Sequence, residues 1–174
     1  MSSPLDSFKN NLKADLRACS EGSRDLKIAY LFHAGFQTLF FYRCARLLFE
    51  WGWVNSARAF TSMARIITSC DIHYKAELEG GVLFPHGRSV VIGEGVKIAK
   101  KSSIFQHTTI GGLAGETGFP ELEEGTNVYP GSVIAGNVKL GEYSRVGPNV
   151  YLTVSVPSHT RVTPPKPNFH IKTK

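Results

Sequence analysis

Two histidines are the residues of this chain best suited to chemistry, because of where they fall in its pattern. His86 lies in the segment FPHGRSVVI, residues 84–92, and is followed directly by Gly87. A histidine in a glycine-flanked, irregular turn is placed to reach the surface. Its ordinary pKa near ~6.5 suits a general base at neutral pH. Spacing alone equally allows an ordinary surface histidine.

His107 is the second candidate. It lies three residues after Ile104 and three before Ile110, in the segment IFQHTTIGG. This spacing predicts that its side chain projects from a corner or an outer face. The remaining histidines are predicted to be structural or exposed, with His33 on the apolar face of a helix and the others at His73, His159 and His170.

Other catalytic and metal-binding patterns are missing from the sequence. It has no GxSxG, P-loop or dinucleotide-binding fingerprint. A zinc site needs about three converging histidines, and neither His86 nor His107 has a partner at ligand spacing. No histidine marks a neighbouring serine or cysteine as a nucleophile. The sequence therefore predicts no metal and no covalent enzyme intermediate.

A repeat that fills the second half of the chain must position these candidates. Apolar residues recur at intervals of six, with a two-residue shift before Ile92 and an irregular stretch before Leu122. This period fits neither a helix nor a hairpin meander. It fits a parallel β-helix in which three units form a coil of about 18 residues. We predict a mainly β fold, a left-handed parallel β-helix, in which these residues point inward: Ile72, Leu78, Phe84, Ile92, Ile98, Ile104, Ile110, Leu122, Val128, Ile134, Leu140, Val146 and Leu152.

Two breaks interrupt this repeat. One is the extra pair of residues before Ile92, and the other is the segment GGLAGETGFPE, residues 111–121, which predicts a loop thrown out from a corner. Departures from a solenoid repeat are where function tends to be inserted. His86 lies in the first break, which strengthens its candidacy.

The first 70 residues predict helices instead. Apolar residues step by three and four between Leu31 and Leu47, a shorter helix is predicted over 5–18, and a third over 57–69 with Asn55 or Ser56 as N-cap. We predict a helical region over 1–70, a β-helix over 71–162 and a tail over 163–174. The most apolar stretch, 28–42, is shorter than the ~18–20 residues of a membrane span. It predicts a buried helix, with peripheral membrane contact as the alternative.

Composition limits the possible partners. The 174 residues are 42% hydrophobic and 20% charged, which excludes wholesale disorder and fits one compact domain or one domain with a helical appendage. A surface of mixed charge accounts for the net charge of +6, so no nucleic-acid partner is predicted. Three widely spaced cysteines and a charged N-terminus without an apolar core predict a cytoplasmic protein without a secretory signal.

Several segments resemble the hexapeptide-repeat acyltransferases, and among them the serine acetyltransferase-like branch, which includes sugar and exopolysaccharide O-acetyltransferases. The resemblance covers roughly residues 15–160. It is carried by AGF at 34–36, YR at 42–43, DIH at 71–73, FPHG at 84–87, VVIG at 90–93, IFQHTTIGG at 104–112 and VSVPSHT at 154–160.

This resemblance implies a trimer or a dimer of trimers that transfers an acetyl group from acetyl-CoA to a hydroxyl. His86 matches the general base of the family, and backbone N–H groups at the corners would hold the oxyanion. The acetyl-CoA groove is implied to run along Gly111, Gly112, Gly131 and Ala135, with Lys166 meeting a phosphate of the coenzyme.

The chain departs from the family at the acceptor site. Pro85 stands where the family has an aspartate, and Phe119 stands where it has a second active-site histidine. Asp25 and Glu21 are the nearest acids to a further substrate-binding aspartate. A free amino acid needs charged partners for its ammonium and carboxylate groups. We therefore predict a saccharide hydroxyl as acceptor, bound near Pro85, Phe119 and Asp25.

His107 is predicted to take over part of the role of the missing histidine. Three other functions stay open at this point. The first is acetylation of L-serine for cysteine synthesis, the second is a catalytically silent β-helix that only binds a partner, and the third is a zinc lyase or hydratase on the same fold.

Overall fold

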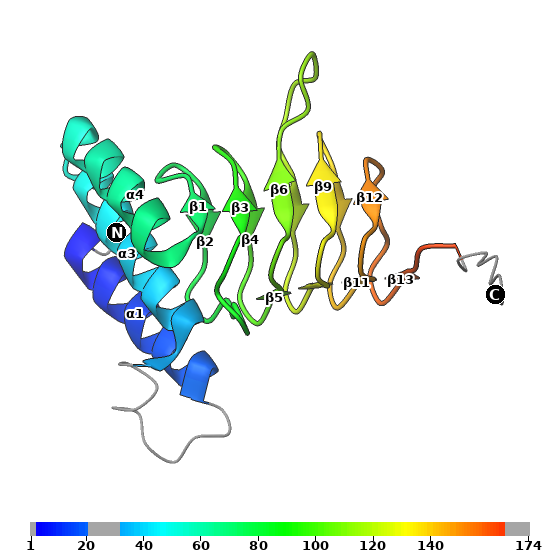
Figure 1. The fold of residues 1–174 in the computed structure, drawn as a ribbon, viewed down its shortest axis with the longest axis horizontal. Helices are drawn as coiled ribbons and strands as arrows, with labels where there is room; N and C mark the ends of the chain where they lie inside the picture. Colours follow the sequence, from blue (N-terminus) through cyan, green and yellow to red (C-terminus); the bar gives the residue numbers. More distant parts are fainter. Residues whose placement is uncertain (1–2, 21–31, 166–174) are drawn as a thin grey trace, which may run out of the picture.

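A computed structural model describes residues 3–20 and 32–165 of the chain. Its helices are α1 (Pro4–Ser20), α3 (Ala34–Glu50) and α4 (Val54–Thr68), and they lie together at one end of the molecule (Figure 1). Short strands follow along the long axis: β1 (Asp71–Ile72), β2 (Glu77–Leu78), β3 (Val91–Ile92), β4 (Lys97–Ile98), β5 (Ser103–Ile104), β6 (Thr109–Gly111), β7 (Glu121–Leu122), β8 (Asn127–Val128), β9 (Val133–Ala135), β10 (Lys139–Leu140), β11 (Arg145–Val146), β12 (Tyr151–Leu152) and β13 (Arg161–Val162).

The strands form three parallel sheets that make the three walls of a prism. Their orders are β1-β3-β6-β9-β12, β10-β7-β4-β2 and β13-β11-β8-β5. Each strand pairs with strands one coil away, as Ile92 does with Ile72 and Ile110. The predicted fold, a left-handed parallel β-helix preceded by helices, is confirmed. The predicted inward-pointing apolar residues are all buried in it.

The corners of the prism repeat as regularly as its walls. One corner position recurs in the left-handed backbone conformation, at Ser89, His107, Gly131 and Asn149. A second corner repeats in the same conformation at Lys101, Gly125, Tyr143 and His159. The residues that follow it are small and buried, such as Ser102 and Thr126, whose hydroxyl groups lie 2.9 Å apart. A tight corner leaves little room for side chains, so a larger residue there would displace the next coil.

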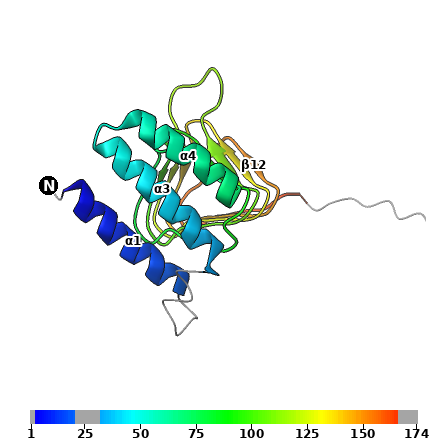
Figure 2. The same ribbon diagram turned by 60° about the vertical axis from the view of Figure 1, so that its left-hand side comes forward.

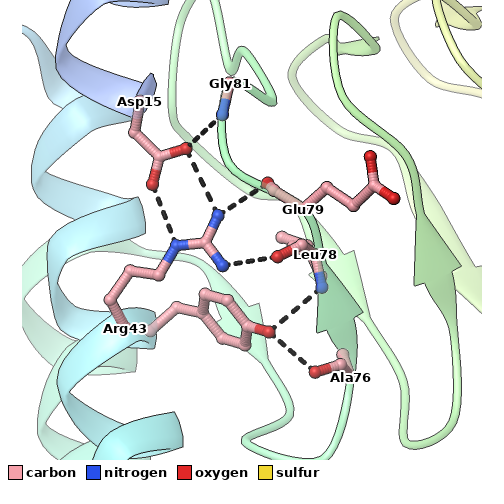
Figure 3. A network of polar contacts seen from close by, with 7 residues as sticks. Asp15, Arg43, Ala76, Leu78, Glu79 and Gly81 are labelled. Atoms are coloured by element: carbon pink, nitrogen blue, oxygen red, sulfur yellow. Dashed lines mark hydrogen bonds and ion pairs between the residues drawn. The ribbon is translucent and has the colours of Figure 1, made fainter. Parts of the chain in front are cut away.

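The helices lie across the first coil (Figure 2). A buried ion pair holds α1 and α3 together, with Arg43 Nε 2.9 Å from a carboxylate oxygen of Asp15 (Figure 3). The same guanidinium group donates to the carbonyls of Leu78 and Glu79, and the Asp15 carboxylate accepts from the backbone N–H of Gly81. This network fixes both helices to the first coil of the β-helix.

One expectation about the helical half is corrected. Helix α4 begins at Val54 after Trp53, with no side-chain cap, so neither Asn55 nor Ser56 is its N-cap. No helix in the described ranges is both long and apolar enough to cross a membrane.

Candidate active site

The first break in the repeat forms a wide corner that leads from Leu83 to β3, and His86 lies on it. The side chain of His86 is exposed. Gly87, directly after it, has a φ of +51°. A Cβ atom added to Gly87 would lie 2.3 Å from the backbone nitrogen of Gly35. The corner therefore depends on glycine for its conformation and for its contact with α3.

The first turn of α3 clamps this corner. Gly35 packs so closely on the carbonyl of Phe84 that an added Cβ would lie 1.9 Å from its oxygen. The hydroxyl of Thr38 lies 3.3 Å from the carbonyl oxygen of Gly87 and 3.0 Å from that of Ala34. Backbone contacts on both sides of His86 thus limit how far its Cα can move.

His33 lies beside the same corner, not on the apolar face of a helix as the sequence predicted. It is the N-cap of α3, and its Nδ1 accepts the backbone N–H of Phe36 at 3.3 Å. Burial lowers the pKa of His33, and the electrostatic effect of His86 lowers it further. The sequence signal that could have located it is its place just before the AGF segment that begins α3.

Aromatic rings continue the corner along the β-helix axis. The ring centroids of His86 and Phe105 are 6.2 Å apart, and Phe105 stacks on Tyr129 at 5.0 Å. His107 lies on the same corner in the next coil, and its backbone N–H donates to the carbonyl of Arg88 at 3.4 Å. The structure therefore brings His107 to the corner of His86. His107 occupies the corner position that Gly131 has one coil later.

The sheet β1-β3-β6-β9-β12 meets one corner of the prism where its strands begin and another where they end. The predicted coenzyme-binding residues divide between these two edges. Gly111 and Ala135 pair on neighbouring strands at one edge, and a Cβ added to Gly111 would meet no atom within 4 Å. Gly131 lies at the opposite edge, where an added Cβ would lie 2.2 Å from the side-chain oxygen of Asn149. Ser89, His107 and Asn149 take the same corner position in other coils, so the backbone conformation alone does not require glycine at residue 131.

Phe119 is held by the loop that projects beyond β6 (Figure 1). An added Cβ on Gly95 would lie 2.3 Å from its ring and one on Gly112 3.3 Å, so the ring covers both glycines. The loop leaves the corner after β6, whereas His86 lies on the corner before β3. These two corners bound opposite edges of one sheet.

Pro85 is half-buried next to His86, while Asp25 and Lys166 lie outside the described residues. In the described part of the chain, no three histidine, cysteine, aspartate or glutamate residues gather as metal ligands would.

Comparisons with known proteins indicate the family to which the chain belongs. Residues 119–153 match the family model "Bacterial transferase hexapeptide (six repeats)". A serine acetyltransferase of Synechococcus elongatus is 31% identical over 156 residues, covering 87% of this chain and 64% of the relative. The soybean serine acetyltransferase structure is 32% identical with a TM-score of 0.82, covering 91% of this chain and 68% of that one.

The chain belongs to the hexapeptide-repeat acyltransferases, in their serine acetyltransferase-like branch. The native serine acetyltransferase 1 of Entamoeba histolytica is similar as well, at 30% identity and a TM-score of 0.83 over 91% of this chain and 64% of that one. The chain spans about half to two thirds of the length of the curated relatives it matches, for example 53% of a plasmid-encoded serine acetyltransferase of Synechococcus elongatus.

Proposed function

We propose that this acyltransferase-family chain is an acetyl-CoA-dependent O-acetyltransferase with His86 as its general base. The observation that carries the proposal is an exposed imidazole on a corner that α3 clamps from both sides. A base must be held near the proton it removes, and proximity of this kind accounts for much of enzymatic rate enhancement.

The proposed reaction is a direct transfer. The imidazole takes the proton of the acceptor hydroxyl as the oxygen attacks the thioester carbon. The carbon–sulfur bond then breaks, and the coenzyme A thiolate receives the proton from the imidazolium. The pantetheine arm would lie along Gly111 and Ala135 of a neighbouring chain, since within one chain these residues are at the edge opposite to His86. Gly111 leaves room for it, because an added Cβ would meet no atom within 4 Å. Backbone N–H groups would hold the negative oxygen of the intermediate.

The relatives support L-serine as the acceptor over the saccharide that the sequence predicted. The relatives reported above are all named serine acetyltransferases. A saccharide hydroxyl stays the second candidate, because an apolar proline adjoins His86 and the apolar ring of Phe119 is 43% exposed. Neither side chain can pair with an ammonium or a carboxylate group. Acetyl transfer from acetyl-CoA to L-serine and to a panel of sugars, followed as thiol release, decides between the two.

We also propose that the site is completed between chains. His86 and Phe119 lie at opposite edges of one sheet, so a neighbouring chain is needed to bring such residues together. A trimer, or a dimer of trimers, would do so. A cytoplasmic location forms part of the proposal and is supported by the free thiols of Cys19, Cys44 and Cys70. Peripheral membrane contact stays a prediction.

His86→Asn is the direct test of the proposed base. We expect kcat to fall by about 10²–10⁴-fold, the range that general base catalysis contributes, while Tm stays unchanged because the side chain is exposed. His159→Asn makes the same change at another exposed histidine and should leave kcat unaltered. Full activity of His86→Asn would refute the proposed mechanism. No turnover in the unaltered protein with any acceptor would favour a silent scaffold, and activity that depends on bound zinc would favour a lyase or hydratase.

A further inference from the structure

His33 caps the helix whose first turn clamps the His86 corner. We propose that His33 is a positioning residue: its neutral imidazole fixes the first turn of α3, and that turn holds His86 in place. This inference rests on the proposed role of His86 as the base.

The path from His33 to His86 consists of short contacts. The Nδ1 of His33 accepts the N–H of Phe36, and its carbonyl accepts the N–H of Gln37 at 3.1 Å. These bonds fix the turn that contains Ala34 and Gly35. The backbone of that turn lies against Phe84 and Gly87, the residues that flank Pro85 and His86.

The first turn of α3 and the corner of His86 are packed backbone against backbone. An added Cβ on either glycine would overlap the backbone of the other segment, at 1.9 Å from one side and 2.3 Å from the other. The Thr38 hydroxyl also reaches the carbonyl of Gly87. Since closely packed backbones move together, a loosened first turn of α3 would shift the corner that bears His86.

The cap works only while the imidazole of His33 is neutral. A neutral imidazole ring has one nitrogen that can accept a hydrogen bond. In a protonated ring both nitrogens are donors, and neither can accept. Burial lowers the pKa of His33 below its ordinary value, and the nearby His86 lowers it further. A backbone hydrogen bond of His33 raises its pKa and partly opposes these effects, but the net direction is downward. This direction favours the form of the ring that can accept the N–H of Phe36.

Two variants separate this role from the alternatives. His33→Asn keeps a side-chain oxygen that can accept the same N–H, because asparagine is among the preferred N-cap residues. His33→Ala removes the acceptor. Ser3→Ala is the matched control, because the Ser3 hydroxyl accepts the N–H of Asp6 at the start of α1, away from the corner. The measurements are kcat and KM with acetyl-CoA, Tm, and amide hydrogen exchange of residues 84–90.

We expect His33→Ala to lower kcat about 10-fold with little change in KM, since small displacements of catalytic groups have effects of this size or larger. Residues 84–90 should then exchange faster. His33→Asn should keep kcat and exchange close to those of the unaltered protein. Ser3→Ala should lower Tm without changing kcat or the exchange of this segment.

Two results would overturn the inference. One is His33→Ala with unchanged kcat and exchange, as for Ser3→Ala, which would make His33 a stabilising cap only. The other is His33→Asn as inactive as His33→Ala with undisturbed exchange, which would mean that the imidazole itself contacts a substrate. If the unaltered protein shows no acetyl transfer, the proposed function fails by itself. The exchange of residues 84–90 then still decides whether His33 holds the corner.

Discussion

At the scale of single residues, Gly87 is where the corner of His86 is most sensitive. It combines a φ of +51° with backbone contacts to α3. We expect Gly87→Ala to lower both stability and kcat, because the added Cβ would push the corner away from Gly35. Gly52→Ala is the matched control, since Gly52 has a φ of +83° but open space around it.

The control should lose only the cost of a left-handed alanine, about 1–2 kcal/mol, and should keep its kcat. Urea denaturation and steady-state kinetics of both variants test this. Equal kcat values for the two variants would show that the contact between Gly87 and α3 does not matter for turnover.

Histidine burial also predicts how stability depends on pH. Burial lowers the pKa values of His33 and His73 below their ordinary value of 6.5, although Glu94 partly opposes the effect at His73. As pH falls below 6.5, the unfolded chain therefore binds protons before the folded protein does. Stability must then decrease with acid over this range.

The measurement is the urea midpoint between pH 7.5 and 5.5. We expect it to fall toward pH 5.5 in the unaltered protein and to fall less in a variant that combines His33→Asn with His73→Asn. A midpoint that is constant over this range, or one that falls equally in both proteins, would contradict the prediction.

The sequence pointed to one part of the candidate site and missed the proposed positioning residue His33, and both outcomes have physical reasons. His86 could be found because it interrupts a strict repeat, and His107 because it falls midway between two buried isoleucines. His33 could not be found in this way. Its proposed role depends on contacts between α3 and a distant corner, such as that of Thr38 with Gly87, 49 residues later. Helical spacing gives no information on such a contact.

At the scale of elements, the Asp15–Arg43 pair decides how α1 and α3 dock on the β-helix. The two side chains are 0% and 3% exposed. We expect Asp15→Ala to cost about 3–5 kcal/mol, because it would leave a buried guanidinium group without its counter-charge. The exposed Arg46–Glu50 pair on α3 is the control, and Glu50→Ala should cost at most about 1 kcal/mol.

Chemical denaturation of both variants measures the difference. Comparable losses in the two would mean that the buried network contributes no more than a surface pair, and that apolar packing alone docks α1.

The elements also show the limits of pattern analysis. The period of six fixes the strands and their register, because each apolar residue must point into the prism. The packing of α1 against the β-helix could not be predicted, since Asp15 and Arg43 are charged and 28 residues apart. Charged residues are ordinarily expected at the surface.

At the scale of the whole molecule, the walls of the prism differ in outward chemistry. The wall β10-β7-β4-β2 presents ion pairs, such as Lys97 with Glu121 at 2.8 Å. The wall β1-β3-β6-β9-β12 carries uncharged residues after its first strand, at Val91, Thr109, Val133 and Tyr151. Uncharged surface is cheaper to remove from water, so the second wall is the better candidate for contact between chains.

A site shared between chains predicts that two inactive variants can restore activity when they are mixed, whereas a site within one chain does not. Suppose that His86 of one chain acts beside the loop of the next, so that His86→Asn and Phe119→Arg each abolish transfer. Random mixing of the two variants in a trimer should then restore activity at about a quarter of the sites, because those sites combine both unaltered residues. Co-expression followed by thiol-release assays and sedimentation tests this. Activity in the mixture no higher than in either variant alone, or an unaltered protein that is active as a monomer, would place the whole site within one chain.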